Sequence, residues 1–145
     1  MRLRLFCSVI FMLAATTAFA QNRACEILTP QEIGTALGGG PASNGIPSPI
    51  DGGSSCTYRS PGVMLIVSVL DKGIEAQFTR IKARVKNVQD IPGIGDSAIL
   101  YEQGGLHDIM VAKRGTGLAI LVRRENTASM RETLIKLAKV AVSHL

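Results

Sequence analysis

Three apolar segments near the C-terminal end, separated by short glycine-containing turns, constrain the fold most strongly. They cover residues 97–102, 106–113 and 118–123. The turns between them, at 103–105 and 114–117, contain two glycines each. Turns this short join antiparallel neighbours, because a parallel crossover needs about a dozen residues or more. These segments are therefore predicted to form an antiparallel meander.

Two further strands are expected earlier in the chain, at 55–59 and 63–70, on either side of the turn Ser60-Pro61-Gly62. The segment 63–70 reads VMLIVSVL and is rich in β-branched residues. Its length and composition predict a central strand that is buried on both faces. Residues 38–54 are rich in Gly, Pro, Ser and Asn, and they predict a loop or an irregular edge.

The first expected helix follows Thr29. Thr29 and Glu32 have the spacing of a capping box, and Gly38 is suited to end the helix after about two turns. A second helix is predicted after Asp71, which can cap it. Its apolar residues recur with the spacing of one helical stripe. They are Ile74, Phe78, Ile81 and Val85.

The last helix is expected to begin near residue 127 or 129 and to run to the C-terminal end. The resulting order of elements is α-β-β-α-β-β-β-α. Because the strands come in hairpins rather than alternating singly with helices, the predicted class is α+β. We expect an antiparallel sheet of about five strands, with three helices packed on one face.

The first 20 residues have the three parts of a signal peptide. Arg2 and Arg4 precede a mostly apolar core, and Ala-Phe-Ala ends just before Gln21. Cleavage there leaves a single domain, residues 21–145, and lowers the net charge from +5 to +3. The protein is therefore expected to be periplasmic or secreted, with no membrane-spanning segment after cleavage.

Two alternatives to cleavage remain. The N-terminal segment could act as an anchor that is never cut, or the chain could be a lipoprotein. A lipoprotein carries its cysteine directly after a small-residue motif at the end of the apolar core. Cys7 lies inside the core and Cys25 follows Asn-Arg-Ala, so neither cysteine fits this pattern well.

Export leaves two cysteines, Cys25 and Cys56, in an oxidising compartment where disulfides persist. Two cysteines allow one intramolecular pairing. The bridge would close a loop of about 30 residues and stabilise the fold by roughly 3 to 4 kcal/mol. It would link the start of the first helix to the first strand. The alternative is a reactive thiol, although the chain lacks a Cys-x-x-Cys motif.

No motif of catalysis or cofactor binding has its required context. Residues 93–98, GIGDSA, match a dinucleotide pattern, but a helix precedes them and a strand follows, the reverse of the required order. We expect these glycines to supply positive φ angles at the entry to the strand. His107 and Asp108 are strand neighbours and should point to opposite faces. No cofactor is predicted, and no cluster has metal-ligand spacing.

Four basic residues alternate along the second helix and flank its apolar stripe. They are Arg80, Lys82, Arg84 and Lys86. They suggest a face for an anionic lipid, a glycan or a periplasmic protein, and the alternative is a solvated helix surface with no partner. Nucleic acid is not expected as a partner, because the domain is exported and poor in aromatic residues.

The segments CEILTPQEIGTALGG, CTYR and IPGIGDSA, followed by a C-terminal amphipathic helix, resemble small exported bacterial proteins of unknown function. The resemblance is to actinobacterial lipoproteins and sensor-like extracellular domains with a Cys-x-Leu-Leu-Thr start and a Gly-Leu-Gly-Asp-x-Ala segment. It implies a Cys25–Cys56 bridge and a compact sandwich of helices and sheet. It implies no catalytic residues.

The sequence favours a non-enzymatic, exported binding or interaction module with an unidentified ligand. One alternative is a small periplasmic hydrolase that uses dispersed residues such as Asp96, Ser97 and His107. Another is a subunit or inhibitor that acts through a protein surface. A pocket that gathers the three polar residues would favour the enzyme, whereas an apolar surface would favour the binding module.

Overall fold

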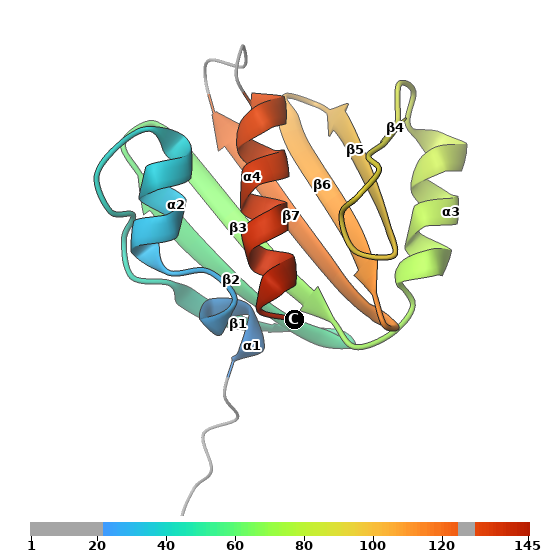
Figure 1. Ribbon diagram of the computed structural model, residues 1–145, viewed down its shortest axis with the longest axis horizontal. Helices are drawn as coiled ribbons and strands as arrows, with labels where there is room; N and C mark the ends of the chain where they lie inside the picture. The colour runs from blue at the N-terminus through green and yellow to red at the C-terminus, as the bar shows by residue number, and fades with distance from the viewer. Residues whose placement is uncertain (1–21, 125–129) are drawn as a thin grey trace, which may run out of the picture.

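The structure is a computed structural model and describes residues 22–124 and 130–145 (Figure 1). The expected signal peptide, residues 1–20, and the expected start of the last helix lie outside these ranges. No helix within the two ranges is long and apolar enough to cross a membrane.

The described residues form one antiparallel sheet of seven strands in the order β1-β2-β3-β7-β6-β5-β4. The strands are β1 (Ile46–Ile50), β2 (Gly53–Ser60), β3 (Val63–Leu70), β4 (Gln89–Asp90), β5 (Ser97–Gln103), β6 (Leu106–Lys113) and β7 (Thr116–Arg124). The five expected strands are present, with bounds that agree within two residues. The expected total of about five is wrong, because β1 and β4 add a strand at each edge of the sheet.

The edge strand β1 lies where the composition predicted a loop or an irregular edge. All of its residues are exposed, and it contains Pro47 and Pro49. Proline has no N–H to donate, so these two residues cannot make the ladder bonds to β2. In an antiparallel pair alternate residues bond to the neighbouring strand. The prolines therefore occupy the alternate positions, whose backbone groups point to the outer edge of the sheet. Their lack of N–H groups leaves the outer edge poorly suited to pairing with another strand.

The described residues include four helices rather than the expected three. They are α1 (Arg23–Glu26), α2 (Pro30–Leu37), α3 (Ile74–Arg84) and α4 (Met130–Ser143). The expected cap of α2 is confirmed. The Glu32 N–H donates to Thr29 Oγ1 at 3.2 Å, the Thr29 N–H donates to Glu32 Oε2 at 2.8 Å, and Gly38 ends the helix with a φ of 76°.

The start of α3 differs from the expectation. Its N-cap position is Gly73, with a φ of 81° and no side-chain cap. The Asp71 carboxylate instead forms an exposed ion pair with Arg23 at 3.1 Å. The glycine φ angles expected before β5 are confirmed, at 78° for Gly93 and 59° for Gly95.

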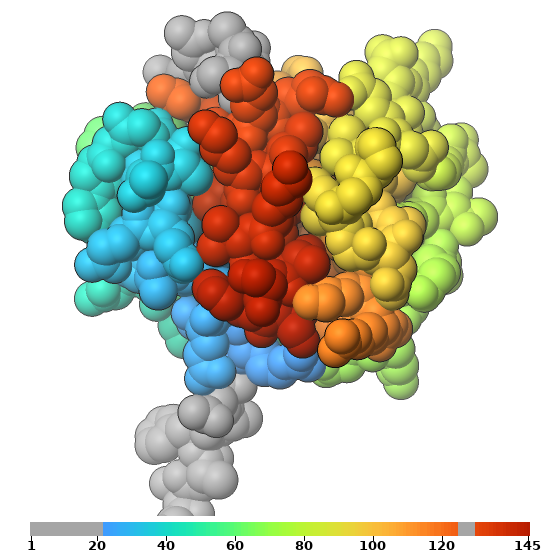
Figure 2. Space-filling model, viewed as in Figure 1, coloured from blue at the N-terminus to red at the C-terminus, as the bar shows by residue number. Residues whose placement is uncertain are grey.

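The helices pack on both faces of the sheet, so the expectation of one covered face is wrong. On one face α1, α2 and α4 pack against the buried set of strand side chains that includes Val67, Ile109 and Leu118. Figure 2 shows α4 between α2 and the segment that leads to β5. On the opposite face α3 packs over β5 and β6, where Ile74 belongs to a second buried cluster with Met110. Sequence periodicity located the stripe of α3 but carried no information about which face it would cover.

The opposite face is only partly covered, and we call its part formed by β1, β2, β3 and β7 the open face. The strand β3 shows the difference between the two sides. Leu65, Val67 and Val69 are buried beneath the helices, whereas Met64 and Ile66, which point to the open face, are only half-buried. The prediction that 63–70 is buried on both faces is therefore wrong for the open side.

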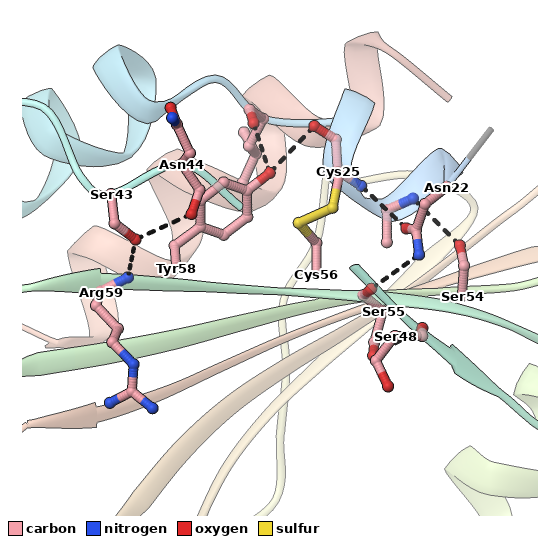
Figure 3. Close-up of a disulfide and its surroundings, with 12 residues drawn as sticks. Asn22, Cys25, Ser43, Asn44, Ser48, Ser54, Ser55, Cys56, Tyr58 and Arg59 are labelled. Carbon is pink, nitrogen blue, oxygen red and sulfur yellow. Dashed lines mark hydrogen bonds between the residues drawn. A yellow bond between two sulfur atoms is a disulfide. The ribbon is translucent and has the colours of Figure 1, made fainter. Parts of the chain in front are cut away.

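The predicted disulfide is present and links Cys25 to Cys56, with 5.0 Å between the two α-carbons (Figure 3). Cys25 lies in α1, a separate short helix ahead of the capped helix, and Cys56 lies in β2. Beside the bridge, the buried Tyr58 hydroxyl donates to the Leu28 carbonyl at 2.9 Å. The Asn22 amide also donates to the Ser55 carbonyl at 3.2 Å. The start of the described chain is therefore fixed to β2 by covalent and polar contacts.

Candidate anion-binding site

The four basic residues predicted to face an anionic partner are not all on one surface. The helix α3 ends at Arg84, so Lys86 lies beyond it. Lys82 forms an ion pair with Asp90 of the edge strand β4, at 2.7 Å. Arg80 and Arg84 are exposed and lie on the other flank of α3, because residues two apart on a helix are separated by about 200°. Because Lys82 lies on the β4 side and α3 packs over β5 and β6, that flank faces the β7 side of the sheet.

Three other arginines gather where the β2–β3 turn, the β5–β6 turn and the end of β7 meet. Arg59, Arg123 and Arg124, which we call the arginine cluster, line a hollow of about 640 Å³ together with Met64. Met64 lies between Arg59 and Arg123 in the register of the sheet. Figure 3 shows Arg59 pointing away from the sheet on the side opposite Tyr58. Arg59 therefore belongs to the open face.

The arginine cluster is not neutralised within the described part of the chain. The ion pairs found there, at N···O distances up to 4.0 Å, all involve other residues. Strand spacing places the α-carbons of Arg59 and Arg123 about 10 Å apart on the same face of the sheet, and two guanidinium groups that share one region of surface repel. An anion between them would remove the repulsion, and guanidinium groups bind carboxylate, sulfate and phosphate oxygens in a two-pronged geometry.

A second hollow, of about 430 Å³, lies beside the first turn of α4 and is lined by both acidic and basic side chains. It is lined by Glu102, His107 and Arg131, among others. The distance from His107 Nδ1 to Glu102 Oε2 is 3.7 Å, too long for a hydrogen bond, and His107 Nε2 is buried without a partner. Arg131 donates to Gln89 at 3.2 Å. The arginine cluster is therefore the more uniformly cationic of the two hollows.

The residues of the hydrolase alternative do not meet. Ser97 begins β5, whereas His107 lies opposite Glu102 near the other end of the same hairpin, about 17 Å away along the strand. The Asp96 carboxylate accepts from the Arg114 N–H at 2.6 Å. The described residues also contain no group of three or more His, Cys, Asp or Glu arranged to hold a metal ion.

A polar pair that no sequence signal identified lies on the same side of the sheet as the open face, next to α3. The Tyr101 hydroxyl donates to Asp108 Oδ2 at 2.9 Å, while Asp108 Oδ1 is buried without a hydrogen-bond partner. Burial raises the pKa of Asp108 to about 6, and the bond from Tyr101 offsets part of this rise. Burial and the nearby Asp108 raise the pKa of Tyr101 as well. As predicted, His107 points to the opposite, helix-covered face.

Comparison with known proteins gives a fold likeness and no family. No protein-family model and no curated protein sequence matches the chain. Among solved structures, the chain is similar to the crystal structure of a GTP-binding regulator from Thermotoga maritima, with a TM-score of 0.50 and 9% identity. The match covers 71% of this chain and 78% of that one. At this identity the likeness concerns the fold alone.

Proposed function

We propose that the protein is an exported, non-enzymatic binding module that holds an anionic group of its partner at the arginine cluster. The signal-peptide pattern of residues 1–20 supports export to the periplasm or beyond the cell. The Cys25–Cys56 bridge supports the same location, because disulfides persist in oxidising compartments. The wide separation of the residues in the hydrolase alternative supports binding rather than catalysis.

One observation carries the proposal: Arg59, Arg123 and Arg124 surround one open hollow, and no described carboxylate pairs with them. A cluster of like charges disfavours the folded state by self-repulsion unless a counter-charge is bound. The methylene stems of the arginines and the Met64 side chain supply an apolar lining beside the charged groups. A ligand with a charged group and an adjacent apolar part fits this combination best.

The nucleotide named for the structural neighbour is not part of this proposal. The glycine run at residues 38–40 is followed by Pro41, whereas a phosphate-binding loop continues with lysine and then serine or threonine. The arginine cluster is formed by strand ends and turns, which lack the helix N-terminus that such loops use.

A second cationic surface is the flank of α3 that carries Arg80 and Arg84. Both side chains are exposed, and neither forms an ion pair with another described residue. This surface retains half of the face predicted from the sequence. Its two charges lie along the flank of a single helix, whereas the arginine cluster lines a hollow.

Calorimetric titration with a heparin-derived octasaccharide separates the two surfaces. The oligosaccharide carries sulfate and carboxylate groups and serves as a defined anionic probe. Three double variants remove the same charge from different places: R59Q/R123Q in the cluster, R80Q/R84Q on α3, and K136Q/K139Q on α4. Lys136 and Lys139 are exposed on the helix-covered side and serve as the matched control.

The expected result is that R59Q/R123Q weakens binding by about tenfold or more and reduces its dependence on salt, whereas the other two variants change it by less than about threefold. Equal weakening in all three would indicate diffuse attraction and contradict the proposal. A loss confined to R80Q/R84Q would assign the site to α3 instead.

A further inference from the structure

The open face carries more apolar side chains than a sheet face that only contacts water usually does. Its outward side chains include Ile46, Ile50, Met64, Ile66, Ala119 and Leu121. The other outward positions on β1, β2, β3 and β7 are serine, threonine, glycine and the two arginines at one end, apart from Leu70 next to α3. None is lysine, aspartate or glutamate. A solvated sheet face usually alternates apolar-in and polar-out; β2 does so, whereas β1, β3 and β7 each present at least two apolar side chains on the open face.

Exposure within this patch is highest at the edge. Ile46 is 57% exposed and Ile50 is 36% exposed, and these are the large exposed apolar side chains of the described residues. On the same side of the sheet, Met110 and Ile99 are buried because α3 lies over β5 and β6. Past α3, apolar side chains therefore continue on β7 and β3 and recur on the edge strand β1, with the small polar residues of β2 between them, and no described helix covers these strands.

The edge of the sheet is not the docking point. Pro47 and Pro49 leave the outer side of β1 without N–H donors at the two positions where an added strand would need them. At the other edge β4 has only two residues. A partner that recognises this region must therefore lie on the face of the sheet rather than extend it.

The dimensions of the face select a small occupant. Four strands at about 4.8 Å spacing give a width near 19 Å, and three outward positions per strand give a length near 20 Å. The resulting area of about 400 Å² is about half of the 800 Å² per partner that a stable dimer usually buries. A second copy of the chain, packed face to face on this patch alone, would therefore bury too little surface. One helix, about 10 Å in diameter, covers about half of this width and leaves room to lie against α3.

A flat membrane surface fits less well than a helix. The helix α3 stands beside the patch on the same face and rises above the strands by about a helix diameter, near 10 Å. The strand side chains therefore form the floor of a step. A bilayer resting on α3 would not reach this floor, whereas a helix can lie next to α3 and contact it.

The basic residues around the floor indicate that a helix bound there would be acidic. Arg59 and Arg123 stand at one end of the floor, and Arg80 and Arg84 lie on the flank of α3 that faces away from β4. The strands of the patch carry no acidic residue. We propose that the open face binds an acidic amphipathic helix of a partner protein, laid beside α3, with its apolar stripe on the sheet and carboxylates at Arg59 and Arg123. This inference rests on the proposed function, because the arginine cluster supplies the anionic contact.

A synthetic 18-residue peptide tests the inference. Its leucines form one helical stripe and its other positions are mainly glutamate, and a scrambled peptide of the same composition lacks the stripe. Ser68 lies in the middle of the patch and is half-buried. The variant S68E places a carboxylate on the floor without altering any arginine, and S68A is its matched control. I46E makes the same change at an exposed edge position, where folding is least affected.

The native protein and S68A are expected to bind the striped peptide at least about tenfold more tightly than the scrambled one, and S68E and I46E are expected to lose this preference. Equal binding of the two peptides, or a preference that survives both substitutions, would overturn the inference. Binding that still depends on Arg59 and Arg123 would then leave the proposed anion site intact.

Two further measurements identify other occupants. Sedimentation that shows a dimer, lost in S68E, would assign the face to a second copy of the chain. Flotation with phosphatidylglycerol vesicles, also lost in S68E, would assign it to a membrane. Either result would overturn the helix proposal.

Discussion

At the scale of single residues, Asp108 is a buried carboxyl group whose hydrogen bonding is incomplete. One oxygen accepts a hydrogen bond from Tyr101 at 2.9 Å, and the other is buried without a partner. Burial penalises the ionised form and raises its pKa from 3.8 to about 6. The hydroxyl of Tyr101 stabilises the carboxylate and limits that rise. Ionisation of Asp108 therefore works against the fold near neutral pH.

The variant D108N should remove a pH-dependent loss of stability. A raised pKa in the folded state means that the native protein gains stability from Asp108 below about pH 4 and loses it as pH rises to about 6. The free energy of unfolding of the native protein relative to D108N should therefore fall by roughly 2 to 3 kcal/mol over this range. Denaturant titrations at pH 4, 5, 6 and 7.5 measure the difference. D51N, at an exposed carboxylate, serves as the control. A difference that is constant with pH would contradict the prediction.

At the scale of elements, the attachment of the segment before β1 to β2 depends on a glycine. A β-carbon at Gly45 would lie 2.3 Å from Cys56 Sγ and 2.9 Å from Tyr58 Cε1. Both neighbours are fixed, because Cys56 is bonded to Cys25 and the Tyr58 hydroxyl donates to a carbonyl of the N-terminal segment. The contact between this segment and β2 therefore has no room for a side chain.

G45A should destabilise the protein by roughly 1 to 3 kcal/mol through overpacking at the disulfide. G39A is the matched control, since a β-carbon at Gly39 would meet nothing within 4 Å and its backbone φ is not positive. Chemical denaturation of the oxidised proteins measures both changes. If G45A were as stable as G39A, the close packing of Gly45 against the bridge would be wrong.

The elements that the sequence predicted are those with local signals. Thr29, Glu32 and Gly38 act within one short helix, and the meander of β5, β6 and β7 is specified by its glycine turns. The strands β1 and β4 were missed for different reasons. Prolines and exposed residues concealed β1, and β4 has two residues, too few to show a period. The short helix α1 has four residues and also lacks a periodic signal.

At the scale of the whole molecule, the candidate site could not be predicted because it depends on pairing between distant segments. Arg59 becomes a neighbour of Arg123 only when β3 pairs with β7, which brings Met64 opposite Arg123. No local pattern encodes that register. Alternating basic residues on α3 gave a clearer sequence signal, but the fold separates them between two flanks and the segment after the helix. The side of the sheet that α3 covers is likewise decided by packing, and it leaves the open face.

The most direct test of the proposed binding function is an NMR titration of the ¹⁵N-labelled native protein, with its disulfide intact, using the heparin-derived octasaccharide. The largest shifts are expected at the amides of residues 59, 60, 62–64, 104–105 and 123–124 and at the guanidinium Nε of Arg59 and Arg123, which line the hollow. Shifts centred on residues 80–84 would place the anion site on α3. Shifts confined to α2 and α4, or no saturable shifts at all, would contradict the assignment of the arginine cluster as the binding site.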